Sequence, residues 1–235
     1  MASSHTNPDR AAIERELEAV YRLYAALAPR MDAEAGLGGK LLYAGEPDEA
    51  GGLLVRAANI AGAATLAASA DAALLRGAMR EGVVDFVVTS LDEALRILKN
   101  EIRRRQTVAV GVVSPPQAIA RQMVERGVQP DLLAPALPDG PELDALVAKG
   151  ARRIVAPPSA AAHLHILPIP AEWAQRTGAL DALLLDAVPP EDFVNRRWVR
   201  LAPRYADRRA RQMRLLARDV EPVLKRIERT GEASS

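Results

Sequence analysis

The chain has 235 residues, of which 49% are hydrophobic, and its formal net charge at pH 7 is +1. This length can bury the core of one α/β domain with a small appendage, while the near-neutral charge points to no particular partner. The absence of cysteine excludes disulfides, thiolate metal sites and a cysteine nucleophile. The N-terminal residues lack the apolar core of a signal peptide, and no run reaches the roughly 20 apolar residues of a membrane span. These features predict a cytoplasmic protein that does not contact membranes.

Helical and strand patterns alternate along most of the chain. Residues 10–28 carry a helical apolar stripe, and the run Leu41–Ala44 predicts a strand that turns at Gly45. The sequence then predicts strands at 64–68, 83–88, 107–113, 131–134 and 153–156, and helices at 50–62, 71–80, 90–105, 117–126 and 142–149. Ser90 is placed to cap its helix. This alternation predicts an α/β fold with a doubly wound, mostly parallel Rossmann-like sheet.

The two ends of the chain differ in character from the middle. We predict a disordered N-terminus at 1–9, an α/β domain with its leading helix at 10–170, a helical appendage at 171–229, and a disordered tail at 230–235. The appendage holds an arginine-rich segment, 195–229, with an apolar stripe that includes Trp198, Met213 and Leu216. Such a stripe packs on the domain or on a second subunit, so a homodimer formed through the helical segments is expected. Basic residues with interleaved aromatics also contact nucleic acid, a role that the neutral overall charge disfavours.

The loop after the first predicted strand is the natural place for a nucleotide phosphate. A helix N-terminus that follows a strand and a glycine-containing turn binds anions. Here the loop carries three carboxylates, Glu46, Asp48 and Glu49, which repel a phosphate. The simplest interpretation is that they cap the helix, because acidic side chains complement its positive end. An alternative is that they bind a cationic or hydroxyl-bearing ligand.

The middle of the chain resembles the central NAD-binding domain of urocanase (urocanate hydratase), from Leu41 to Asp131. The matching pieces are AGAATL at 61–66, SLDEAL at 90–95, TVAVGVV at 107–113 and ERGVQPDLL at 125–133. The segment 159–173 resembles a further S-A-H…L-P-A-G-W stretch of the family. The resemblance implies a Rossmann-like fold and, in the family's own members, a bound NAD that acts as an electrophile on the imidazole ring of urocanate.

At the ligand positions the sequence departs from the family's pattern. The glycine-rich loop of the family, A-G-x-G-G-M-G-G-A-Q-P, aligns with residues 45–55, where only the pair Gly51 and Gly52 keeps its place. Ser69 stands where the family has a ribose-binding acidic residue, and Leu74 stands where an arginine follows. The family's H-G-N-A turn becomes residues 113–116, with sequence VSPP. These changes predict a domain that no longer binds NAD in the family's manner.

Two classes of function follow. The first is a stand-alone, non-hydratase relative of the urocanase domain that binds a small ligand or a partner. For this class we expect no cofactor. The second is an NAD- or nucleotide-dependent lyase-type enzyme, for which NAD remains possible. Urocanate hydration is disfavoured because much of the family's catalytic apparatus lies in C-terminal sequence that is absent here. For either class the candidate crevice residues are Gly45, Gly51, Gly52, Ser114, Ser159 and His163.

Other catalytic and metal-binding patterns are weak. His163 and His165 form an H-x-H pair whose imidazoles would share one face of a strand, as many metal sites require. No third ligand is evident nearby, so the sequence predicts no metal site and no catalytic residue. Neither the G-x-S-x-G motif of serine hydrolases nor a Walker A motif occurs.

Overall fold

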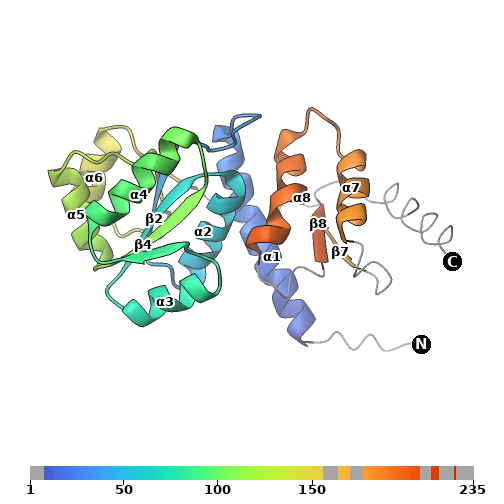
Figure 1. Ribbon diagram of the computed structural model, residues 1–235, viewed down its shortest axis with the longest axis horizontal. Coiled ribbons are helices and arrows are strands. Elements are labelled where there is room, and N and C mark those ends of the chain that lie inside the picture. Colours follow the sequence, from blue (N-terminus) through green and yellow to red (C-terminus); the bar gives the residue numbers. More distant parts are fainter. Residues whose placement is uncertain (1–7, 156–163, 170–176, 207–212, 217–224, 226–235) are drawn as a thin grey trace. The chain divides into compact units, whose positions relative to one another are not determined.

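Short apolar runs form a six-stranded sheet in which all neighbouring strands are parallel (Figure 1). The strand order is β3-β4-β2-β1-β5-β6. In chain order the strands are β1 (Leu41–Gly45), β2 (Ala64–Ser69), β3 (Phe86–Val88), β4 (Val108–Val113), β5 (Leu132–Leu133) and β6 (Arg152–Arg153). Every residue of β1 and β2 is buried, as expected for central parallel strands covered on both faces. The predicted Rossmann-like α/β fold is confirmed.

The computed structural model describes residues 8–155, 164–169, 177–206, 213–216 and 225. The chain divides into two units. We call Leu23–Pro157, which holds the six-stranded sheet, the sheet unit. We call the part built from Met1–Arg22 and Pro158–Ser235 the terminal unit. Among the described residues, no helix combines the length and apolarity needed to cross a membrane.

Five helices connect the strands of the sheet unit: α2 (Glu49–Ala61), α3 (Ala72–Arg80), α4 (Leu91–Arg104), α5 (Pro116–Glu125) and α6 (Pro141–Ala148). Helices α2 and α3 cover one face, where small side chains such as Ala67 and Ala109 pack with Val55 and Ala78. Side chains alternate between the faces of a strand, so Val108 and Val110 of β4 point to the other face. Helix α4 covers that face and buries one apolar stripe: Leu91, Ala94, Leu95 and Leu98.

Polar side chains begin three of these helices. Asp48, Asp71 and Ser90 are the N-caps of α2, α3 and α4, and each side chain accepts a hydrogen bond from a backbone N–H of the first turn. The predicted cap at Ser90 is therefore confirmed, with Glu93 as the donor. These caps satisfy N–H groups that the helix itself leaves unpaired.

The terminal unit combines the N-terminal part of α1 (Pro8–Leu27) with α7 (Thr177–Ala187), α8 (Phe193–Tyr205) and a small sheet. The sheet pairs β7 (His165–Pro168) with β8 (Met213–Leu216) in antiparallel fashion. The expectation that Met213 and Leu216 continue a helical stripe is wrong. All four residues of β8 are buried, because the strand lies against α7 and α8 instead of extending them.

The core of the terminal unit is apolar with a few anchored polar groups. Leu184, Val199 and Leu216 pack together, and Trp198 donates a hydrogen bond from Nε1 to the carbonyl of Leu215 at 3.1 Å. The ring of Tyr21 on α1 meets Trp198 edge-on, with 4.8 Å between the centroids. Burial, with the nearby charge of Asp192, raises the pKa of Tyr21 to about 12, so this hydroxyl stays protonated at neutral pH.

Candidate functional site

The loop between β1 and α2 is closed by its own side chains. Asp48 accepts a hydrogen bond from the backbone N–H of Gly51 at 2.8 Å, and the carbonyl of Asp48 accepts from the N–H of Gly52 at 2.7 Å. The capping interpretation is therefore confirmed for Asp48. These two N–H groups belong to the glycine pair that keeps the family's pattern, and both already have a partner within the protein.

Glu46 does not cap the helix, in contrast to the capping interpretation. Its carboxylate accepts a hydrogen bond of 2.5 Å from the hydroxyl of Ser69 at the end of β2. The same hydroxyl accepts from the backbone N–H of Asp71 at 3.0 Å, so Ser69 links the loops that follow β1 and β2. Ser69 is fully buried, whereas Glu46 is exposed. The structure thus places a carboxylate at the end of β2, supplied by the loop after β1.

The strand order changes direction between β1 and β5. The chain runs from β1 to β2 on one side, and β5 lies on the other side of β1. Parallel sheets bind ligands at the carboxyl ends of strands where the direction of winding changes in this way.

Leu137 lies against Gly45 at the carboxyl end of β1. A Cβ atom added to Gly45 would lie 2.7 Å from Cδ2 of Leu137, and only 6% of Leu137 is exposed. Gly45 has φ of +72°, a conformation that glycine adopts without strain. The loop after β5 is held by Arg153 of β6, whose guanidinium donates to the carbonyl of Leu137 and pairs with Asp139, both at 2.8 Å.

The loop after β4 is tied down at two points. The backbone N–H of Ser114 donates to the carbonyl of Ser69 at 2.9 Å. The hydroxyl of Tyr43, from the buried strand β1, donates to the carbonyl of Pro116 at 2.6 Å. Burial raises the pKa of Tyr43, which keeps this donor protonated. The start of α5 is therefore positioned by the central strand.

The structure places four of the six predicted crevice residues at the same edge of the sheet: Gly45, Gly51, Gly52 and Ser114. Ser159 and His163 lie outside the described residues. His165, the second member of the H-x-H pair, is exposed on β7. Within the described parts of the chain, no group of three or more His, Cys, Asp or Glu side chains is arranged to hold a metal ion.

Two contributors to this edge were missed by sequence reasoning. Leu137 lies in a proline-flanked loop, and nothing in its local sequence indicates that it covers Gly45 more than 90 residues earlier. Tyr43 is part of an apolar run, and nothing in the local sequence indicates that its hydroxyl bonds to α5. Both contacts join segments that are distant in sequence, so only the strand order reveals them.

This geometry defines a class of protein: a Rossmann-like α/β domain with its candidate ligand site at the carboxyl edge of a parallel sheet. The family model named Urocanase, for the urocanase Rossmann-like domain, matches residues 18–136. This match covers just over half of the chain, so the chain belongs to the urocanase family. The resemblance noted from the sequence is thereby confirmed. Because this domain binds NAD in the family, NAD is a possible ligand of this chain.

The residues around the loop fit the diphosphate of NAD poorly. The N–H groups of Gly51 and Gly52 already donate hydrogen bonds to Asp48, and Pro47 has no N–H group. A carboxylate about 4 Å from a phosphate charge costs about 1 kcal/mol in water and about 4 kcal/mol at the effective dielectric of a protein surface. Glu46, Asp48 and Glu49 are all exposed and belong to this short loop.

The basic C-terminal segment is used in part to hold the terminal unit together. Arg196 of α8 donates to the carbonyls of Leu185 and Val188. The arginines at 208, 209 and 211, with most of the segment after Leu216, lie outside the described residues.

Proposed function

We propose that this chain is a non-hydratase member of the urocanase family with an altered NAD site, acting as a small-ligand-binding or interaction module. The observation that carries the proposal is the cap at Asp48. Its side chain and carbonyl occupy the two glycine N–H groups at the start of α2. A diphosphate at this helix would have to displace a carboxylate that belongs to the same loop.

The contact between Glu46 and Ser69 supports the same proposal. In NAD-binding Rossmann domains an acidic residue near the end of the second strand receives the ribose hydroxyls. Here the end of β2 is Ser69, and its hydroxyl is bonded to Glu46. The carboxylate of Glu46 belongs to the loop where the diphosphate would lie and reaches the end of β2, where the ribose would lie. It therefore places negative charge near both the diphosphate and the ribose of a dinucleotide.

Leu137 adds a steric argument. It lies against Gly45 at the carboxyl end of β1, and Arg153 holds its loop by two contacts of 2.8 Å. A ligand that entered as NAD does in this fold would have to move that loop. Retention of the fold together with these three changes favours a ligand other than NAD, or a protein partner.

Titration with NAD tests the proposal. We expect the wild-type chain to show no saturable heat by calorimetry and no rise in melting temperature at millimolar NAD. The variant Glu46→Ala/Asp48→Ala, which removes two carboxylates and frees the N–H of Gly51, is expected to gain NAD affinity by about tenfold or more. Ser90→Ala is the matched control, because it removes the N-cap of α4 and leaves the loop after β1 intact.

The opposite result has a clear meaning. Saturable binding of NAD by the wild-type chain at micromolar concentration would contradict the altered site and favour the nucleotide-dependent lyase-type enzyme. Incubation with urocanate, with NAD supplied, is expected to leave its ultraviolet absorbance unchanged. Turnover of urocanate would overturn the non-hydratase assignment even if NAD bound weakly.

A further inference from the structure

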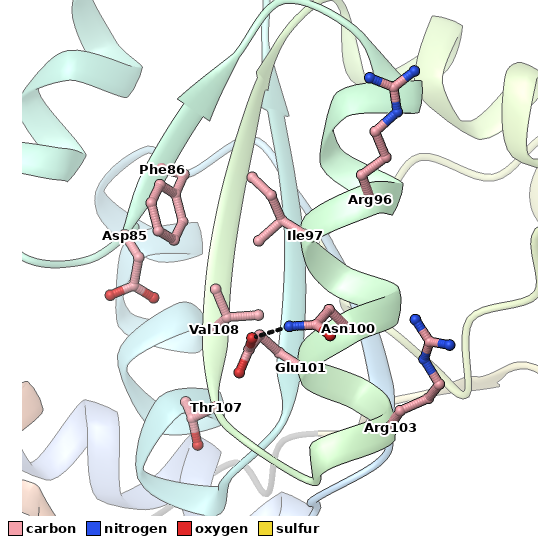
Figure 2. A pocket seen from close by; sticks show the side chains of 9 residues that line it. All are labelled: Asp85, Phe86, Arg96, Ile97, Asn100, Glu101, Arg103, Thr107 and Val108. Carbon is pink, nitrogen blue, oxygen red and sulfur yellow. Dashed lines mark hydrogen bonds between the residues drawn. The ribbon is translucent and has the colours of Figure 1, made fainter.

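Access from solvent differs between two places on the sheet unit. A hollow of about 840 Å³ lies between α4 and the strands β3 and β4, and Figure 2 shows the side chains that line it. The carboxyl end of β1 is instead covered by Leu137, which belongs to the loop between β5 and α6. We call residues 135–140 of this connection the β5 loop.

The β5 loop buries one side chain. Leu137 is only 6% exposed, whereas its neighbours Pro135, Ala136, Pro138 and Asp139 are all exposed. Burial of the leucine is therefore the apolar contribution that favours the observed position of the loop. A loop with a single buried anchor changes position when that one side chain leaves its place.

The end of β1 is shaped to receive Leu137. The register between β1 and β2 shifts between Tyr43 and Gly45, which marks an irregularity where β1 ends. A Cβ atom at Gly45 would lie 2.7 Å from Cδ2 of Leu137 and 3.6 Å from its Cγ. Only glycine leaves room for the leucine here, so the contact depends on one of the candidate crevice residues.

Little else in the backbone holds the β5 loop to the sheet. Among the described residues, no backbone hydrogen bond joins residues 135–139 to a strand. The N–H of Leu137 donates to the carbonyl of Ala134, but this bond is long, at 3.4 Å, and lies within the same turn. Segments with so few hydrogen bonds open locally at a lower free-energy cost than the core of a domain.

The guanidinium of Arg153 on β6 supplies the polar attachment of the β5 loop. It donates to the carbonyl of Leu137 and pairs with the carboxylate of Asp139, both at 2.8 Å. The side chain of Arg153 is 33% exposed, and that of Asp139 is 89% exposed. An ion pair this exposed is weak because water and salt screen it, so the attachment can break while the sheet stays folded.

We propose that the β5 loop is a lid over the carboxyl end of β1, with Leu137 as its plug and Arg153 as its latch. Opening moves Leu137 off Gly45 and gives a ligand access to the edge where the strand order changes direction. Prolines at 135, 138 and 141 each fix a φ angle, so the loop moves largely as one piece. The proposal rests on the proposed function for the kind of ligand that enters, but its test uses no ligand.

Reaction of a single cysteine with a maleimide tests the lid, because the chain has no cysteine of its own. Leu137→Cys is expected to react at least about a hundredfold more slowly than Arg103→Cys, whose position is exposed on α4 (Figure 2). Adding Arg153→Met to Leu137→Cys is expected to raise the rate about tenfold, because the charged hydrogen bond and the ion pair are lost. Loss of a nearby positive charge would by itself make the thiol less reactive, so a faster reaction reports opening.

Two further variants in the Leu137→Cys chain serve as controls. Arg126→Met is the matched control, since it removes an exposed ion pair with Asp92 that lies outside the β5 loop. Asp139→Asn is expected to raise the rate only about two- to threefold, because the bond from Arg153 to the carbonyl at position 137 remains. Circular dichroism confirms that each variant is folded. A thiol at position 137 that reacts as fast as one at 103, that Arg153→Met does not accelerate, or that Arg126→Met accelerates equally would overturn the lid.

Failure of the lid and failure of the proposed function give different results. Saturable binding of NAD by the wild type would contradict the altered NAD site, whereas the labelling rates would still show a latched loop. Labelling that Arg153→Met leaves unchanged would overturn the lid, whereas the cap at Asp48 would still occupy the N–H groups at the start of α2.

Discussion

Replacing Gly51 with alanine is expected to lower the free energy of unfolding of the sheet unit by about 3 kcal/mol or more. A Cβ atom at this position would lie 1.9 Å from the carbonyl oxygen of Glu46 and 3.3 Å from the carboxylate of Asp48. The nearest obstacle is backbone, so it cannot rotate away as a flexible side chain could. The loop after β1 would have to move, and the cap of α2 would be lost with it.

Gly52→Ala is the matched control for this prediction. The two glycines are adjacent in the first turn of α2, but the nearest atom to a Cβ at Gly52 is Cγ1 of Val83 at 3.9 Å. Alanine favours a helix over glycine by about 1 kcal/mol, so Gly52→Ala is expected to be neutral or stabilising. Urea unfolding of the two variants measures the difference. Equal stabilities would show that the loop does not approach α2 as closely as described.

The second large effect is expected in the terminal unit. Trp198→Ala removes a side chain that is 2% exposed and is expected to cost about 3 to 5 kcal/mol. The change deletes the edge-on contact with Tyr21 and leaves the carbonyl of Leu215 without its indole donor. The Trp198 ring joins its own helix, α8, to α1 and β8, so its truncation removes contacts between three elements.

Hydrogen exchange followed by mass spectrometry locates this damage. Amides of α7, α8 and the β7–β8 pair are expected to lose protection in Trp198→Ala, whereas those of β1, β2 and β4 keep it. Trp198→Phe keeps a ring but not the indole donor, and a smaller loss of about 1 to 2 kcal/mol is expected. Equal loss of protection in both units would mean that they unfold as one cooperative body.

Much of the sheet unit was predictable because its signals are local. The apolar runs of β1, β2 and β4 lie within a residue of their predicted positions, since central parallel strands need near-continuous hydrophobicity. The helix caps at Asp48 and Ser90 were also predictable, because a cap depends on residues only three positions apart. The family resemblance rests on the same local pieces.

The sequence-based predictions were wrong where segments that are distant in the sequence contact each other. Glu46 was assigned to the helix cap, but Ser69, which lies 23 residues later, holds it at the end of β2. Met213 and Leu216 share the apolar spacing of a helix, yet β7 provides a strand for them to pair with. A short apolar run is compatible with either structure until its neighbour is known.

By itself the sequence determined the kind of fold, the places where helices begin and the acidic character of the loop after β1. These properties depend on residues that are close together in the sequence, so their pattern can be seen without knowing the fold. Only the tertiary structure decided that the strand order changes direction between β1 and β5, that Leu137 covers Gly45, and that Phe86 lies on an edge strand of the sheet. Those facts depend on strand order, which arises from packing between segments many residues apart.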